Sequence, residues 1–208
     1  MRTSPLAVGA LTLIAILATG CTGEEGAGDG DGSEAPQSPA GVQPTAAPSV
    51  TAGIFMPPGE SRAAITYDET AVPEGATSDV QVRVQDGSTF VQFSGTGLEA
   101  DRDFGAHVHT RPCGEEPEDA GPHYQNEEDP AADAETPSTD PAYANPENEV
   151  WLDFTTDGTG AVTVSATVPW EFREGGAASL VLHERHTATD HDEAGTAGDR
   201  LACVSVDF

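Results

Sequence analysis

Alternating apolar and polar residues, separated by turn signals, limit the fold of this chain more than any other feature. Residues 80–85 read Val-Gln-Val-Arg-Val-Gln, the pair Asp86-Gly87 follows, and residues 89–93 alternate again. Alternation with a period of two is typical of a strand with one buried face, and Asp-Gly between two such runs is a hairpin signal. The region therefore predicts two antiparallel strands joined by a tight turn.

Six further segments show a strand pattern, and we find no convincing amphipathic helix. They are residues 64–67, 105–110, 149–155, 162–168, 179–184 and 200–207. Eight short strands with polar turns predict an all-β fold, an eight-stranded antiparallel sandwich or barrel. Two segments, 113–148 and 184–199, are too long for hairpin loops, and loops of that length are usually functional or disordered.

The N-terminal residues have the pattern of an export signal. Arg2 supplies a positive charge, residues 6–17 form a short apolar run, and Ala18-Thr19-Gly20 is a small-residue processing site. The run is too short to span a bilayer, which needs ~20 residues. The motif Leu-Ala-Thr-Gly-Cys21 resembles the lipobox of bacterial lipoproteins, in which the cysteine is lipidated. The alternative is an ordinary cleaved signal with a chance cysteine.

Composition divides the rest of the chain. Residues 22–60 are rich in Gly, Ala, Ser, Pro, Glu and Asp and show no periodicity, so we expect a disordered tether. The expected organisation is a lipoprotein signal peptide over 1–21, this flexible linker over 22–60 and one folded β domain over 61–208.

The chain is strongly acidic. Its 208 residues hold 36 Asp and Glu against eight Lys and Arg, for a formal net charge of -28. Such a surface repels phosphate, so nucleic acid and anionic lipid headgroups are poor partners.

The cysteines suggest a covalent link. If Cys21 carries lipid, Cys113 and Cys203 are left, and disulfides persist in exported proteins. We therefore predict a Cys113–Cys203 disulfide, with two free buried thiols as the alternative. In the chain-entropy description, closing a loop of about 90 residues stabilises a fold by at most ~4–5 kcal/mol.

Histidines gather in one region of the sequence. His107 and His109 are two apart on a predicted strand, so their side chains project to the same side. His123 follows after a connector that begins at Cys113, and His183 ends a later apolar run. Four imidazoles without a thiolate suit Cu(II), but zinc also accepts imidazole, and the spacing alone leaves the metal open.

Four segments together resemble the Cu/Zn superoxide dismutase family, in order and with suitable spacing. They are Gly105-Ala-His-Val-His109, Ala120-Gly-Pro-His-Tyr124, Leu182-His-Glu184 and Ala197-Gly-Asp-Arg-Leu-Ala-Cys203. The resemblance covers essentially the whole folded domain. It implies an eight-stranded Greek-key barrel with a metal site on its outer wall, under two long loops.

The resemblance also implies roles for single residues. Cys113 and Cys203 match the intrasubunit disulfide of the family. Arg200 matches the arginine that guides and docks superoxide beside copper; its alternative role is an exposed residue at a strand end. The family counterpart of His123 passes a proton to the reduced substrate, so His123 and Arg200 are the expected catalytic residues. The four copper ligands correspond to His107, His109, His123 and His183.

The zinc site of the family has no match in this sequence. That site takes two more histidines and an aspartate from the loop after His123, but no histidine lies between Tyr124 and Trp151. The aspartate expected four residues after the last copper ligand falls on Thr187. The chain thus resembles a copper-only branch of the family, with copper as its cofactor and zinc absent.

Other residues near the predicted site receive weaker interpretations. We interpret His186 and His191 as surface residues, with auxiliary metal binding as the alternative. Without zinc, the far nitrogen of His123 needs another hydrogen-bond partner or solvent. Four loop carboxylates are interpreted as a solvated acidic loop that could catch a hard cation weakly: Asp129, Asp133, Asp140 and Glu149.

The sequence as a whole predicts an extracytoplasmic, copper-dependent superoxide dismutase that yields dioxygen and hydrogen peroxide. Its partners would be superoxide and, through lipid on Cys21, the cell membrane; without the lipid it would be secreted. A homodimer is compatible with the resemblance, since family members pair through different surfaces. One alternative is a non-catalytic copper-binding or copper-buffering lipoprotein on the same fold, and another is a bare barrel for adhesion or scaffolding. Arg200 favours the enzyme, because a copper buffer needs no anion-docking arginine.

Overall fold

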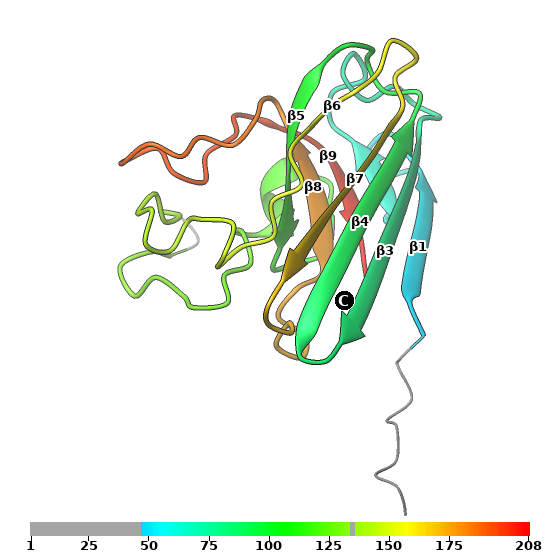
Figure 1. Cartoon of the computed structure of the whole chain (residues 1–208). Coiled ribbons are helices and arrows are strands. Elements are labelled where there is room, and N and C mark those ends of the chain that lie inside the picture. The colour runs from blue at the N-terminus through cyan, green and yellow to red at the C-terminus, as the bar shows by residue number, and fades with distance from the viewer. Residues whose placement is uncertain (1–46, 134–135) are drawn as a thin grey trace, which may run out of the picture. The chain divides into compact units, whose positions relative to one another are not determined.

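The computed structural model of the chain describes residues 47–133 and 136–208 (Figure 1). In these residues nine strands form two sheets, and one short 3-10 helix, η1 (Pro117–Ala120), follows the strand that carries His107. The predicted signal peptide with Cys21 and most of the predicted linker lie outside the described residues. The described part of the chain contains no helix that is long and apolar enough to cross a membrane.

The first sheet has four strands in the order β1-β3-β4-β7, and every neighbouring pair is antiparallel. Asp86 and Gly87 join β3 to β4, and both have a positive φ (53° and 78°), the region that a two-residue hairpin turn requires. The predicted hairpin is confirmed. The strand bounds are β1 (Ser49–Ile54), β3 (Thr77–Gln85), β4 (Ser88–Thr96) and β7 (Val162–Val168).

The second sheet has five strands in the order β2-β9-β8-β5-β6, again all antiparallel. Its two edge strands, β2 and β6, are the shortest in the described chain. The bounds are β2 (Ala64–Thr66), β5 (Asp103–His109), β6 (Phe154–Thr155), β8 (Ser179–His183) and β9 (Arg200–Ser205).

The core lies between the sheets and follows from the alternation of side chains along each strand. Phe104, Ala106 and Val108 of β5 are buried in the main hydrophobic cluster with residues of β3, β4, β8 and β9. His107 and His109 alternate with these core residues along the strand and therefore point to the other side of the five-stranded sheet. The core is the reason that this histidine pair faces outward together.

The all-β, antiparallel prediction is confirmed, with sheets of four and five strands in place of a closed barrel. The Greek-key connectivity implied by the resemblance stays a prediction. Seven of the eight predicted strands match observed ones to within a few residues. In the eighth, 149–155, only Phe154–Thr155 forms a strand, and its earlier residues pair with β5 through the isolated bridge between His107 and Trp151.

The predicted linker boundary is wrong. Strand β1 and the fully buried Phe55 belong to the folded part, although both fall within the segment 22–60 that we expected to be a tether. β1 is paired with β3 along six residues, so its backbone groups have hydrogen-bond partners. Its small and polar side chains gave no sequence signal for a strand.

The two predicted long loops leave the five-stranded sheet on the same side (Figure 1). One connects β5 to β6 and the other connects β8 to β9. The second crosses the sheet closely at Gly105, where an added Cβ would lie 2.6 Å from the carbonyl oxygen of Arg185 and 2.8 Å from Cβ of Ala197. A side chain at position 105 would push this loop off the sheet.

Candidate metal centre

The outer face of the five-stranded sheet brings the four predicted ligands together. β5 carries His107 and His109, β8 ends at His183, and His123 pairs with His109 through an isolated bridge. One ring nitrogen from each of the four lies within 4.8 Å of the others. In the described residues no other group of three or more His, Cys, Asp or Glu is arranged in this way.

Backbone carbonyls determine which nitrogen two of the rings offer. Nδ1 of His109 lies 2.8 Å from the carbonyl oxygen of Gly121, and Nδ1 of His183 lies 3.5 Å from that of Gly198. A carbonyl only accepts, so both Nδ1 atoms carry the proton and both Nε2 atoms hold a lone pair. These two Nε2 atoms are 3.3 Å apart. Facing lone pairs repel each other unless a cation lies between them.

His107 is oriented the opposite way by Thr187. The Thr187 hydroxyl lies 2.7 Å from His107 Nε2 and 2.7 Å from a carboxylate oxygen of Asp153. Since the hydroxyl has one hydrogen and the carboxylate only accepts, Thr187 donates to Asp153 and accepts from His107 Nε2–H. This leaves a lone pair on His107 Nδ1, a buried atom with no hydrogen-bond partner among the described residues. Thr187, the position at which the family pattern has an aspartate, thus links His107 to the carboxylate of Asp153.

Glu149 provides the partner that His123 was expected to need. Its carboxylate accepts from His123 Nδ1 (2.9 Å), from Trp151 Nε1 (2.8 Å) and from the side-chain amide of Gln125 (2.8 Å). Nε2 of His123 is therefore the atom left for a metal or a substrate. The interpretation of Glu149 as a solvated loop carboxylate is wrong, because its relative exposure is 1%.

The sequence held a signal for Glu149 that the loop interpretation missed. Val150 and Leu152 are core residues, so an extended chain places Glu149 and Trp151 on the opposite side, where the histidines lie. Asp129 and Asp140 form local hydrogen bonds: Asp129 accepts from Ala131 N–H and from the Ser138 hydroxyl, and Asp140 accepts from Ala142 N–H.

The ring environment keeps the ligands neutral. Burial, reinforced by the neighbouring imidazoles, lowers the pKa of His107 and His109 well below the ordinary histidine value, and burial does the same for His183. Neutral imidazole is the form that binds a metal ion. Three neutral rings and Nε2 of His123, which converge within 4.8 Å, therefore fit a metal ion, and the all-nitrogen set suits copper or zinc.

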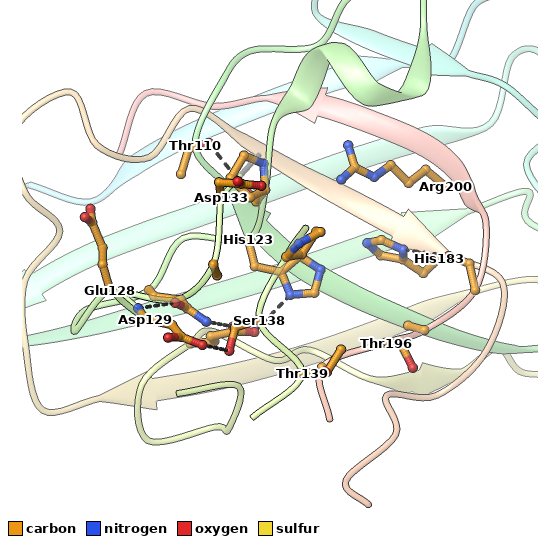
Figure 2. A pocket seen from close by; sticks show the side chains of 18 of the residues that line it. Thr110, His123, Glu128, Asp129, Asp133, Ser138, Thr139, His183, Thr196 and Arg200 are labelled. Atoms are coloured by element: carbon orange, nitrogen blue, oxygen red, sulfur yellow. Dashed lines mark hydrogen bonds and ion pairs between the residues drawn. The ribbon is translucent and has the colours of Figure 1, made fainter. Parts of the chain in front are cut away.

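Arg200 lies at the same site. It opens β9 next to His183, its Nη1 donates to the carbonyl oxygen of Pro117 (2.9 Å), and it lines a pocket of about 510 Å³ with His123 and His183. Figure 2 shows the three side chains at this pocket. Burial lowers the pKa of Arg200, but an arginine starts from a value so high that it keeps its charge. Arg200 is thus a fixed cation beside the histidines.

The predicted disulfide is confirmed between Cys113 and Cys203. It packs with Ile65, Ala120 and Val181 on the outer face of the five-stranded sheet. The bridge ties the segment that carries η1, and hence the carbonyl that holds Arg200, to β9.

The other two histidines lie away from the cluster. His186 Nε2 bonds to the carbonyl oxygen of Phe154 (3.0 Å), and His191 pairs with Asp192 at an exposed position.

No protein-family model and no curated protein matches the sequence. Among solved structures, the chain is similar to two mutants of a SOD-like protein from Bacillus subtilis. The double mutant is 18% identical with a TM-score of 0.42, and the single mutant is 15% identical with a TM-score of 0.43. Each comparison covers 62% of this chain and 88% of the other. Likeness at this level leaves the function to be argued from the site itself.

Proposed function

We propose that this chain is a copper-dependent superoxide dismutase that works outside the cytoplasm and belongs to the copper-only branch of the Cu/Zn superoxide dismutase family. The observation that supports this most is the convergence of four imidazoles beside the cation of Arg200. When bound, copper supplies alternate one-electron oxidation and reduction of superoxide, which yields dioxygen and, with two protons, hydrogen peroxide.

The residues around the site have distinct tasks in this proposal. Arg200 binds the anionic substrate through its guanidinium, held in place by the carbonyl of Pro117. His123, the most exposed of the four rings at 19%, takes up a proton from solvent at Nε2 and gives it to the reduced substrate. Glu149 keeps the other proton of His123 on Nδ1, so that proton transfer is confined to the nitrogen on the substrate side.

Metal selectivity belongs to the proposal as well. Where the family places a second metal against the far nitrogen of the bridging histidine, this chain places Glu149, so we expect one copper and no zinc.

A lipid on Cys21 would hold the enzyme at the extracytoplasmic face of the cell membrane. Replacing Cys21 with Ser should then move the protein from the membrane fraction to the soluble fraction of the expressing cells.

Metal analysis paired with a dismutation assay tests the proposal. We expect one copper per chain and turnover in the parent protein, loss of turnover in His123→Ala, and no change in the matched surface variant His191→Ala. Far-ultraviolet circular dichroism should show that His123→Ala keeps its sheets.

The outcomes separate the alternatives. Stoichiometric copper without turnover would reject the enzyme in favour of a copper-buffering lipoprotein. Absence of copper binding would reject both and leave a scaffold module, and full turnover in His123→Ala would refute the assignment of that residue.

A further inference from the structure

Both ends of the acidic loop, residues 125–148, are held by the connection between β7 and β8. At one end Arg173 donates to the carbonyl oxygens of Gln125 (2.9 Å) and Asn126 (2.8 Å). At the other end Trp170 Nε1 donates to the carbonyl oxygen of Glu147 (2.8 Å). We call Trp170 and Arg173 the loop clamp.

The clamp is connected to the metal centre by a short path. Gln125, whose carbonyl Arg173 binds, donates from its side-chain amide to one oxygen of Glu149 (2.8 Å). The other oxygen of Glu149 accepts from His123 Nδ1 (2.9 Å). Arg173 is thus separated from His123 by Gln125 and Glu149 alone.

The two loop ends also hold each other. The side chain of Asn148 accepts from the backbone N–H of Glu127 (2.7 Å) and donates to the carbonyl oxygens of Glu127 and Tyr143 (2.8 Å each). Asn148 directly precedes Glu149, so a shift at the first end of the loop is passed to the carboxylate at the second.

Geometry, not charge, dominates what Arg173 does here. Its ion pair with Glu128 is largely exposed (45% and 78%), and exposed pairs of this kind contribute little. The planar fork on two successive carbonyls, with the guanidinium 4.5 Å from the centre of the Tyr124 ring, fixes the backbone just after His123. A lysine supplies the same charge but cannot make that fork.

We propose that Arg173 is a positioning residue of the metal centre, which sets the ring of His123 through Gln125 and Glu149. The inference deepens the proposed function, since the orientation of His123 matters to catalysis only if that function holds. The orientation itself can be measured without any metal.

Long-range ¹H–¹⁵N NMR of the histidine rings in the full-length, metal-free chain tests the proposal, because it distinguishes the two neutral tautomers. At mildly alkaline pH we expect the ring proton of His123 on Nδ1 in the parent chain and distributed over both ring nitrogens in Arg173→Ala. Arg173→Lys should resemble Arg173→Ala. The matched control is Arg62→Ala, which removes the same charge from an exposed side chain without hydrogen bonds to the described residues.

Two results would overturn the proposal. One is a His123 tautomer that is the same in Arg173→Ala and in the parent chain, and the other is full retention of the tautomer in Arg173→Lys, which would mean that charge alone suffices. If Arg173→Ala does not fold, Trp170→Phe removes the hydrogen bond to Glu147 from the other half of the clamp while it keeps an aromatic ring at that position. It should shift His123 in the same direction, and an unchanged His123 signal there would overturn the proposal too.

Copper-loaded protein distinguishes the failure of this inference from that of the proposed function. We expect turnover to fall about tenfold in Arg173→Ala, the low end for partners of metal ligands, with an altered Cu(II) hyperfine splitting and no change in Arg62→Ala. A parent chain that binds copper without turnover would reject the function, while the metal-free NMR still decides the positioning role. An active parent whose Arg173→Ala variant keeps both turnover and tautomer would reject the positioning role alone.

Discussion

Each imidazole of the cluster is oriented by a different kind of neighbour. Backbone carbonyls hold His109 and His183, and a threonine hydroxyl holds His107. Only His123 depends on a charged side chain, that of Glu149. The ring with the most exposure and the proposed proton-transfer role is therefore the one that is oriented by an acidic side chain.

Glu149→Gln removes the charge at His123 while keeping the volume of the side chain. The amide group would turn one N–H donor toward partners that are themselves donors, so one hydrogen bond is lost. We expect copper affinity or turnover to fall about 10- to 100-fold, measured by chelator competition and a dismutation assay. Glu147→Gln, at an exposed position in the same loop, is the control, and equal values for the two variants would contradict the role of Glu149.

The metal-free protein should lose stability as the pH falls below the ordinary histidine range. Burial lowers the pKa of His107, His109 and His183, so the unfolded chain binds more protons than the folded chain below about pH 6.5. The free energy of unfolding therefore rises with pH there, by up to about 1.4 kcal/mol per pH unit for each ring, and this dependence ends above the unfolded pKa.

Urea unfolding of the metal-free chain at several pH values measures this effect. His107→Asn should lower the slope by about one proton, whereas His191→Asn, at an exposed position, should leave it unchanged. A slope that is identical in all three chains would contradict the assignment of neutral, buried imidazoles.

The site residues that could be predicted from the sequence are those that lie in short motifs with a characteristic spacing. The two-residue step of His107 and His109 on a strand, and the motifs around His123, His183 and Arg200, all led to positions at one site. The role of Glu149 could not be read in the same way, because its partners are 24 and 26 residues away in a loop without regular structure.

At the level of elements, strands with an apolar alternation were found and β1 was not. Its residues are Ser-Val-Thr-Ala-Gly-Ile, and the outward Val50 and Ile54 are more than half exposed, so the strand has no clear buried face. Its pairing with β3 and the burial of Phe55 directly after it are tertiary effects. Local pattern cannot report a strand that is stabilised mainly by its neighbour.

Two truncations test the contribution of β1. A chain that begins at residue 47 should unfold at the same temperature as the parent, whereas one that begins at residue 61 loses β1 and Phe55 and bares the edge of β3. Removal of one buried Phe alone costs about 1.5–3 kcal/mol of transfer free energy. Thermal unfolding and solubility measure the result, and equal stability of the two truncations would restore the original linker boundary.

The disulfide affects both the stability of the fold and the position of Arg200, the cation proposed to bind the substrate. Replacing both Cys113 and Cys203 with Ala should lower the free energy of unfolding by about 2–5 kcal/mol, because the bridge closes a 90-residue separation. The double substitution should also loosen the segment whose Pro117 carbonyl holds Arg200, so turnover should fall more than copper content does. Urea unfolding with and without reductant measures the first effect, and unchanged values would contradict the structural role of the bridge.

For the molecule as a whole, the negative charge is concentrated outside the strands. The nine strands carry Asp79, Asp103, Arg83 and Arg200, which cancel. Of the loops beside the metal centre, residues 125–148 contain no Lys or Arg, and residues 184–199 contain one Arg, Arg185, and no Lys. An anion that approaches the pocket thus meets the repulsion of these loops first and, at short range, the attraction of the arginines that line the pocket, Arg173, Arg185 and Arg200.

The net charge of -28 should therefore slow the capture of superoxide at low ionic strength. The Debye length falls from ~30 Å at 0.01 M salt to ~8 Å at 0.15 M, which screens the distant carboxylates more than it weakens the contact with Arg200. We expect kcat/KM to rise with salt over this range, roughly two- to tenfold, given the size of electrostatic effects on association. Pulse radiolysis at constant pH and viscosity measures it. A steep fall of kcat/KM with salt would mean that a local positive field outweighs the charge of the whole chain.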